Sequence, residues 1–367
     1  ANALILVLLD GVVFIILTVT GLRKIIFEAI PEAVKKAIPA GIGLFIAFLG
    51  LQNAGIVVND ASTCVNLVSL NLLGSATWSS IMPILVTIFG LLAIAILSKR
   101  QVKGAILWGI LGSAVAYYLL GFTIPGFYDG FAASLSFNPI DSFKEFATES
   151  VGKVFTEGFD FSAYIASNGT ANLILVIVTS ALAFCLVDMF DTMGTLYGAC
   201  ARGNLLDENG DIPNMNKAML ADAVATTTGA ICGTSTVTTF VESSSGVAEG
   251  GRTGLSAIVT ACLFFIAMFL SPVAQLIPSC ATATALIYVG ILMVNCVKDI
   301  EWTDVEIGVP AFLAMALMPF TYNISYGIAF GLISYIVIKV GMGKIKEIKI
   351  GTWIIAIMFT IMFFVTH

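Results

Sequence analysis

The sequence predicts an all-α membrane protein, built as a polytopic bundle of helices. Hydrophobic residues make up 58% of the chain and charged residues only 11%, whereas a soluble domain carries about 25% charged residues. Most of the outer surface must therefore face lipid. Long apolar runs recur along the whole chain, and helices satisfy the backbone groups of such runs inside a bilayer. The runs are too long and continuous for the alternating pattern of a transmembrane β-barrel.

The apolar runs predict where the transmembrane helices lie, since a helix needs about 20 apolar residues to cross the hydrocarbon layer. The candidate spans lie near residues 2–19, 36–57, 81–97, 104–121, 172–195, 217–232, 254–276, 281–297, 306–320, 323–341 and 350–366. A further short apolar element covers about 234–248. Residues 21–35 mix apolar and charged positions at helical spacing, which predicts an amphipathic helix at the membrane surface.

Loop charges predict the orientation, because basic loops stay in the cytoplasm. Lysine and arginine gather at 23–36 and 99–103, which we place inside, and acidic residues gather at 123–170, which we place outside. The last run, 350–366, either crosses again or lies differently.

Two pairs of spans suggest a weak internal repeat. The pairs at 81–121 and 306–341 each have a short polar break, followed by the glycine-containing elements GAILWG (104–109) and YGIAFG (326–331). Repeated halves are typical of secondary transporters, although glycine spacing is also a common packing device.

The composition excludes several classes of site. The net charge of −6 offers no basic patch for a nucleic acid. The seven cysteines form no CxxC pair and the only histidine is His367, which argues against a zinc site and against histidine catalysis. We therefore expect no metal and no cofactor, and we interpret the cysteines as small apolar packing residues.

A first polar group interrupts the apolar run ALAFCLVDMFDTMGTLYG. Asp188, Asp191 and Thr195 are spaced by three, four and seven residues, so they share one face of a helix. Carboxylates are costly inside a bilayer and usually functional there. Two interpretations stay open: the face points into the protein interior, or it marks a helix end in contact with headgroup water.

A second polar group lies in the run GAICGTSTVTTFVESSSG, residues 229–246. Its glycines break a helix, and the β-branched stretch 234–241 favours an extended conformation. Glu242 and the serines after it suit the start of a short helix. The pattern predicts a discontinuous membrane segment, which marks substrate sites in transporters. The alternative is a polar loop between two ordinary spans.

Together, Asp191 and Glu242 suit a planar heterocycle. A carboxylate accepts hydrogen bonds from paired ring N–H groups, and free backbone N–H groups at a helix start donate to ring carbonyls. A buried acid can also carry a coupling proton. Other small polar solutes fit the same chemistry.

Three stretches of the sequence resemble the AzgA-like hypoxanthine/guanine permeases. They are VDMFDTMGTLYG, TSTVTTFVESSSGVAEGGRTGL and AGIGLFIAFLGLQNAGIVV. These belong to the nucleobase/ascorbate transporter superfamily, which includes the xanthine/uracil permeases. The resemblance implies two inverted repeats of seven spans each, with a core domain and a gate domain. It also implies a substrate site between two half-helices that follow short extended segments. On this likeness the chain begins at the fourth span, and we expect three further spans, one with the other extended segment, in the whole protein.

The same resemblance implies the domain organisation. It divides the chain into 1–20 (first-repeat core), 21–122 (first-repeat gate), 123–170 (extracellular loop), 171–278 (second-repeat core) and 279–367 (second-repeat gate).

The resemblance also implies roles for site residues. Glu242 matches the acid that binds the base, and Asp191 and Asp188 match functional acids two spans earlier; all three are candidates for proton coupling. Thr195 replaces a histidine of the uracil branch, which favours the purine branch. Phe240, Val241 and Ser243 would line the site, whereas Asp222 and Arg252 are expected to be structural or loop residues.

The predicted function is therefore import of a purine base by proton symport, through alternating access of an elevator type, in the cell membrane. Guanine and hypoxanthine are expected, with adenine and xanthine as open alternatives, and a homodimer fits the superfamily. A carrier for another polar or anionic solute is the main alternative. A site for an anion would favour a basic residue at the start of the half-helix, whereas this chain has the acidic Glu242 there. An enzyme is not expected, since an intramembrane aspartyl protease needs carboxylates on separate elements. Nothing repeats like a channel's selectivity filter.

Overall fold

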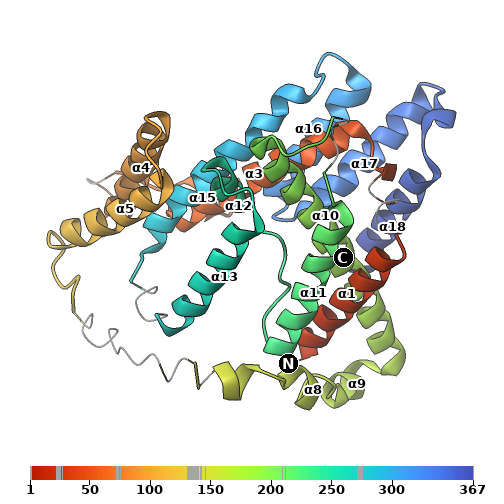
Figure 1. Cartoon of the computed structure of the whole chain (residues 1–367), viewed down its shortest axis with the longest axis horizontal. Coiled ribbons are helices and arrows are strands. Elements are labelled where there is room, and N and C mark those ends of the chain that lie inside the picture. Colours follow the sequence, from red (N-terminus) through yellow and green to blue (C-terminus); the bar gives the residue numbers. More distant parts are fainter. Residues whose placement is uncertain are drawn as a thin grey trace. The chain divides into compact units, whose positions relative to one another are not determined.

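The computed structural model describes residues 2–21, 26, 28–71, 74, 76–129, 140, 143–144, 146–208, 210, 212–240, 242–270 and 276–366. The described chain is mainly helical (Figure 1) and forms two compact units. The first unit comprises Ala1–Ile42, Glu145–Ser243 and Met293–His367; the second comprises Gly43–Lys144 and Ser244–Leu292.

The first unit contains most of the long helices. They are α1 (Asn2–Val19), the start of α3 (Glu32–Asn53), α10 (Thr170–Gly203), α11 (Met215–Cys232), α16 (Val305–Phe320), α17 (Ile324–Gly341) and α18 (Ile350–Thr366). Its short elements are a π-helix (Phe146–Ser150), α8 (Lys153–Thr156), α9 (Ser162–Asn168) and two 3₁₀ turns (Asn295–Asp299, Ile345–Glu347).

The second unit contains the remaining elements. They are the rest of α3, a hairpin of β1 (Val57–Asp60) and β2 (Cys64–Leu67), α4 (Trp78–Lys99), α5 (Ala105–Gly121), α12 (Ser243–Ala248), α13 (Gly254–Phe269) and α15 (Ser279–Val294). The core and gate division implied by the resemblance is a functional division and stays a prediction.

Most predicted spans coincide with helices, which confirms the all-α membrane fold. By length and composition, five of the described helices can cross a membrane: Asn2–Val19, Glu32–Asn53, Trp78–Lys99, Ser279–Asp299 and Ile324–Gly341. Shorter apolar helices cover Ala105–Gly121, Gly254–Phe269, Val305–Phe320 and Ile350–Ile361. The sequence-based prediction thus located the helices well and their ends less well.

Several helix boundaries differ from the predicted ones. α10 continues to Gly203, beyond the predicted end at 195. α3 ends at Asn53, where polar residues and a left-handed Gly55 (φ 71°) turn the chain into the hairpin. The amphipathic helix predicted at 21–35 falls partly on 22–25 and 27, which lie outside the described residues.

Small residues bring the helices of the first unit into close contact. α16 and α17 lie side by side (Figure 1), and a Cβ at Gly327 would lie 2.4 Å from the Ala314 carbonyl oxygen. α1 is pressed onto α11 at Gly11, where a Cβ would lie 2.4 Å from Thr227 Oγ1. Such contacts between small residues are how membrane helices associate when lipid and side chains are equally apolar.

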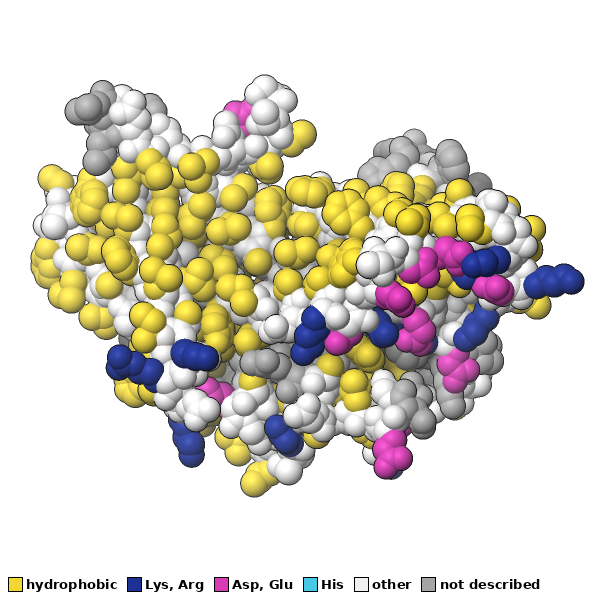
Figure 2. All heavy atoms as spheres, turned by 90° about the horizontal axis from the view of Figure 1, so that it is seen from above, with side chains coloured by type: hydrophobic (Ala, Val, Ile, Leu, Met, Phe, Trp, Pro, Cys, Tyr) yellow, Lys and Arg dark blue, Asp and Glu magenta, His cyan; other side chains and the backbone are white. Residues whose placement is uncertain are grey.

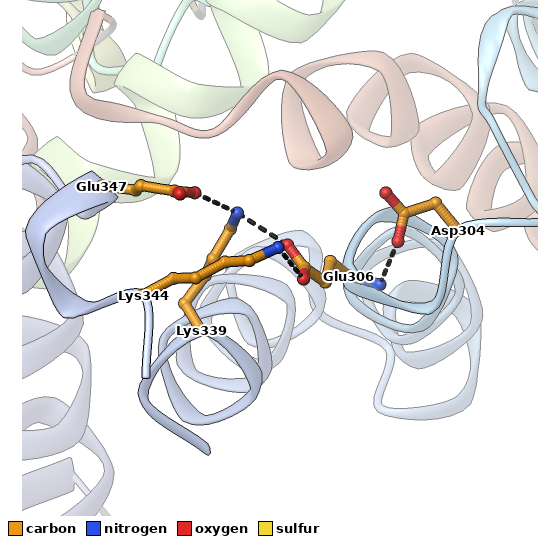
Figure 3. Close-up of polar contacts among 5 residues, drawn as sticks. All are labelled: Asp304, Glu306, Lys339, Lys344 and Glu347. Atoms are coloured by element: carbon orange, nitrogen blue, oxygen red, sulfur yellow. Dashed lines mark hydrogen bonds and ion pairs between the residues drawn. The ribbon is translucent and has the colours of Figure 1, made fainter. Parts of the chain in front are cut away.

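An ionic cluster joins α16, α17 and the turn before α18 (Figure 3). Lys339 Nζ lies 2.7 Å from Glu306 Oε2 and 2.6 Å from Glu347 Oε2, and Lys344 also pairs with Glu306. Asp304 caps α16 by accepting a hydrogen bond from the Glu306 amide at 2.8 Å. Glu306 and Glu347 are thus paired with lysines, and Asp304 is paired with a backbone amide of the helix that it caps.

The second unit is packed in the same way. α4 and α5 meet at Gly90, where a Cβ would lie 2.0 Å from Ser113 Oγ, and at Gly109, which contacts Ile94. Thr87 donates a hydrogen bond of 2.9 Å to the Cys280 carbonyl and so ties α4 to α15. Both helix pairs of the suggested repeat are therefore hairpins held by glycine contacts.

The surface is largely apolar, as expected for a protein in lipid. Figure 2 shows hydrophobic side chains over much of one face. α13 has no buried residue, and large apolar side chains such as Leu255, Phe264 and Phe265 are exposed on it. A surface of this kind would aggregate in water, since soluble monomers rarely expose large contiguous apolar patches.

Candidate functional site

The polar face of α10 is buried inside the first unit. Asp188 is 2% exposed, and Thr192 and Thr195 are fully buried. Of the two interpretations left open by the sequence, the structure supports the one that places this face in the interior. α10 also runs on for two turns beyond Thr195, so these residues are not at the helix end.

Asp222 of α11 lies at the centre of a hydrogen-bond network. Thr192 Oγ1 donates to Asp222 Oδ2 at 2.7 Å, and Thr239 Oγ1 donates to Oδ1 at 3.1 Å. One carboxylate therefore connects α10 and α11 with the segment that follows α11. Hydrogen bonds of this kind are what allow a carboxylate to be buried at all.

The segment after α11 is not helical, in agreement with the helix break that the glycines predict. Residues 234–240 form neither helix nor strand, and α12 begins at Ser243. Thr226 Oγ1 donates to the Val237 carbonyl at 2.9 Å and lies 3.4 Å from Asp188 Oδ2. Val237 also packs against Gly229, where a Cβ would lie 2.5 Å from the valine side chain. The broken segment is thus held against α11 by its backbone and by packing.

Asp191 lies where these contacts converge. Its Oδ1 is enclosed and has no hydrogen-bond partner among the residues that the structure describes. The Thr238 side chain hydrogen-bonds to the carboxylate, and Asp222 and Glu242 lie near enough to interact with it electrostatically. The structure therefore brings together the two acids, Asp191 and Glu242, that the sequence pointed to from separate runs.

The other predicted residues lie around this centre. The Thr195 hydroxyl is enclosed and has no partner within the described part of the chain. Glu242 and Ser243 are exposed at the start of α12, and Phe240 is 60% exposed. Val241 lies outside the described residues.

Comparison with known proteins agrees with this architecture. A family model described as "Permease family", that of the xanthine/uracil permeases, matches residues 1–330. The chain belongs to this permease family. It is accordingly a multi-pass protein of the cell membrane, in a family of transporters rather than enzymes.

This permease has relatives that it matches over nearly its whole length. It is 40% identical to the putative permease MJ0326 of Methanocaldococcus jannaschii, over 97% of this chain and 74% of the relative. It is 38% identical to the guanine/hypoxanthine permease PbuO of Bacillus subtilis, over 100% of this chain and 78% of the relative. It is 37% identical to the adenine permease AdeP of Escherichia coli, over 94% and 70%.

Several residues of the permease's polar centre were missed or given a lesser role from sequence. Asp222 was expected to be a structural or loop residue, and its hydrogen bonds from Thr192 and Thr239 give it a structural role at the point where three elements meet. Asp10, in the middle of α1, is fully buried and was not singled out. The available signal was simple: each is an acid within a predicted span, the position where charge is costly.

The arrangement has two chemical capacities. Its carboxylates and threonine hydroxyls offer acceptors and donors for a small polar molecule, and an acid buried at membrane depth can take up and release a proton. In the described part of the chain, no group of three or more His, Cys, Asp or Glu side chains is arranged to hold a metal ion.

Proposed function

We propose that this permease carries purine nucleobases into the cell, with guanine and hypoxanthine as the first candidates. The observation that carries the proposal is the convergence of Asp191 and Glu242 beside an extended segment, in a chain whose relatives include a guanine/hypoxanthine permease. A carboxylate accepts two hydrogen bonds at once, and guanine presents a matching pair in its ring N1–H and its exocyclic amino group. On the same edge, hypoxanthine offers the ring N1–H alone.

The site residues take the following roles in this proposal. Glu242 and Asp191 bind the base, while Phe240, Val241 and Ser243 form the adjoining wall. Asp188 and Thr195 extend the polar face of α10 towards the same centre. The adenine permease AdeP is about as similar to this chain as the guanine/hypoxanthine permease PbuO, so adenine is the alternative within the purine class.

The proposal includes proton symport by an alternating-access movement of the elevator type. Supporting it are Asp188, which is 2% exposed, and Asp191, whose Oδ1 is enclosed. A carboxylate enclosed within an apolar helix bundle can carry a proton between the two sides. The alternative is a carrier for another small polar or anionic solute on the same fold.

Uptake of labelled hypoxanthine into proteoliposomes tests the proposal. The full-length protein should accumulate hypoxanthine when an inward proton gradient is imposed, and unlabelled guanine should compete. Competition by adenine alone would assign the adenine alternative. A well-folded protein that takes up no purine would contradict the purine proposal and favour another solute.

A further inference from the structure

Asp10 is the only charged residue of α1, and it lies near the middle of that helix. Its side chain is 0% exposed. It sits on the stripe of buried α1 residues formed by Val7, Gly11, Phe14 and Thr18. A carboxylate at the centre of a helix that can span the membrane is a functional candidate, because it is expensive to keep there.

The packing of α1 places Asp10 at the level of the polar centre. α1 packs against α10 and α11, the two helices that carry the site (Figure 1). Gly11, the next residue, is in direct contact with Thr227. Thr226, the neighbour of Thr227 in the sequence, hydrogen-bonds to Asp188 Oδ2. Asp10 and Asp188 therefore lie at the same height along the helix bundle.

The helices around Asp10 carry further titratable groups. α10 contributes Asp188, Asp191 and the buried Cys185, and α11 contributes Asp222. α8, which also packs on α1, contributes Lys153, and its ammonium pairs with Glu157 at 2.6 Å. The acids of α1, α10 and α11 thus occupy one buried region.

We propose that Asp10 is a proton-carrying residue of the transport cycle. Its carboxylate takes up a proton when the site is open to the outside and releases it to the cytoplasm after the site has changed sides. The base need not touch Asp10, because Gly11 couples any movement of α1 directly to α11. This inference rests on the proposed function, purine:proton symport, and adds a residue on a third helix to it.

The test compares two transport modes in proteoliposomes. Proton-driven accumulation needs the carrier to lose its proton inside, whereas exchange of internal for external hypoxanthine proceeds with the proton bound throughout. Asp10→Asn resembles a permanently protonated carboxyl group, and Asp10→Glu keeps the titratable group. Asp299→Asn, an exposed acid outside the site, is the control.

Asp10→Asn should exchange hypoxanthine like the wild type but accumulate about tenfold less, a loss within the usual range of coupling between two ligands. Asp10→Glu should restore part of the accumulation, and Asp299→Asn should behave as wild type. Normal accumulation by Asp10→Asn would overturn the inference. Loss of both modes in Asp10→Asn and Asp10→Glu alike would also overturn it, because it would show a purely structural residue.

The wild-type measurement separates the two proposals. If the wild type accumulates no purine, the proposed function fails before any variant is considered. If it accumulates purine and acidifies the vesicle interior, a failure of the Asp10 variants to differ from it affects this inference alone.

Discussion

Threonine hydroxyls make most of the contacts that hold the polar centre together. Thr192 and Thr226 project from helices, and Thr238 and Thr239 from the extended segment. Threonine suits both settings, because its branched side chain favours extended backbone and its stiff χ1 fixes the hydroxyl direction. The site is therefore built from short, rigid donors around carboxylates.

Removing one of these donors should destabilise the protein. Thr192→Val keeps the shape of the side chain but leaves the buried Asp222 with one hydrogen bond fewer, which costs about 1–3 kcal/mol. The matched control is Thr228→Val, whose exposed hydroxyl donates to the Val224 carbonyl of its own helix. Thermal unfolding in detergent should show a lower Tm for Thr192→Val alone. Equal Tm values would show that the Thr192–Asp222 contact contributes nothing to stability.

Neutral variants of the two acids should separate binding from folding. Glu242→Gln should abolish base binding and Asp191→Asn should abolish transport, because the amide replaces one of the two accepting carboxylate oxygens with an NH2 group that only donates. Both proteins should remain folded. Glu249→Gln, an exposed acid after α12, is the control. Unchanged affinity in Glu242→Gln, or wild-type uptake by Asp191→Asn, would remove that residue from the site.

The sequence predicted which elements contribute to the candidate site. Carboxylates within apolar runs identified α10, and the β-branched run between Gly233 and Glu242 predicted an extended segment followed by a short helix. What it could not predict was the pairing across elements. The contacts of Thr192 with Asp222 and of Thr226 with Val237 depend on which faces of α10 and α11 meet, and helical periodicity on one chain does not contain that information.

The ends of elements were also less predictable than their centres. Hydropathy places the middle of an apolar run, but local hydrogen bonding decides where the helix stops. The hairpin after α3 shows this. Hydropathy alone places Val57 and Val58 at the end of a membrane span, yet in the structure they pair with Leu67 and Asn66 as strand residues. The turn that allows this pairing depends on Asp60 and not on hydrophobicity.

The hairpin turn should persist into acid. Hydrogen bonds from the Ser62 hydroxyl and amide, and then from Thr63 and Asn66, hold the pKa of Asp60 well below its usual range. A carboxylate with a lowered folded-state pKa stabilises the fold above its unfolded pKa, and the effect is lost as the pH falls through the folded pKa. The turn should therefore open only in strong acid.

A carboxyl ¹³C NMR titration of the detergent-solubilised protein checks this expectation, with Asp60→Asn to assign the resonance. Ser62→Ala removes the strongest donor and should move the pKa of Asp60 up towards its usual value. Identical titration curves for Asp60 in the wild type and in Ser62→Ala would contradict the assignment of the hydroxyl as the main cause.

The whole molecule has two kinds of exposed surface, one facing water and one facing lipid. Cys64 in the hairpin and Cys262 on α13 are both exposed free thiols. Cys64 lies beside polar residues of the hairpin, whereas Cys262 lies on a mainly apolar helix that has no charged residue. The exposed fraction of a side chain does not show whether the side chain faces water or lipid.

Labelling should distinguish them. In single-cysteine variants reconstituted in vesicles, a membrane-impermeant maleimide should modify Cys64 and leave Cys262 unmodified, while a lipid-soluble maleimide should reach both. The buried Cys280 should react with neither until the protein is denatured. Modification of Cys262 by the impermeant reagent at the rate of Cys64 would show that α13 lines water and not lipid.

The contact between Thr226 and its two neighbours has a mechanical consequence. A threonine hydroxyl has one hydrogen, and here two acceptors are in reach, the Val237 carbonyl at 2.9 Å and Asp188 Oδ2 at 3.4 Å. An ionised carboxylate attracts that hydrogen more strongly than a neutral one does. The charge on Asp188 of α10 therefore affects how strongly the Thr226 hydroxyl holds the Val237 carbonyl. Rotation of this one O–H bond can convert a change in the protonation of Asp188 into a movement of the segment after α11.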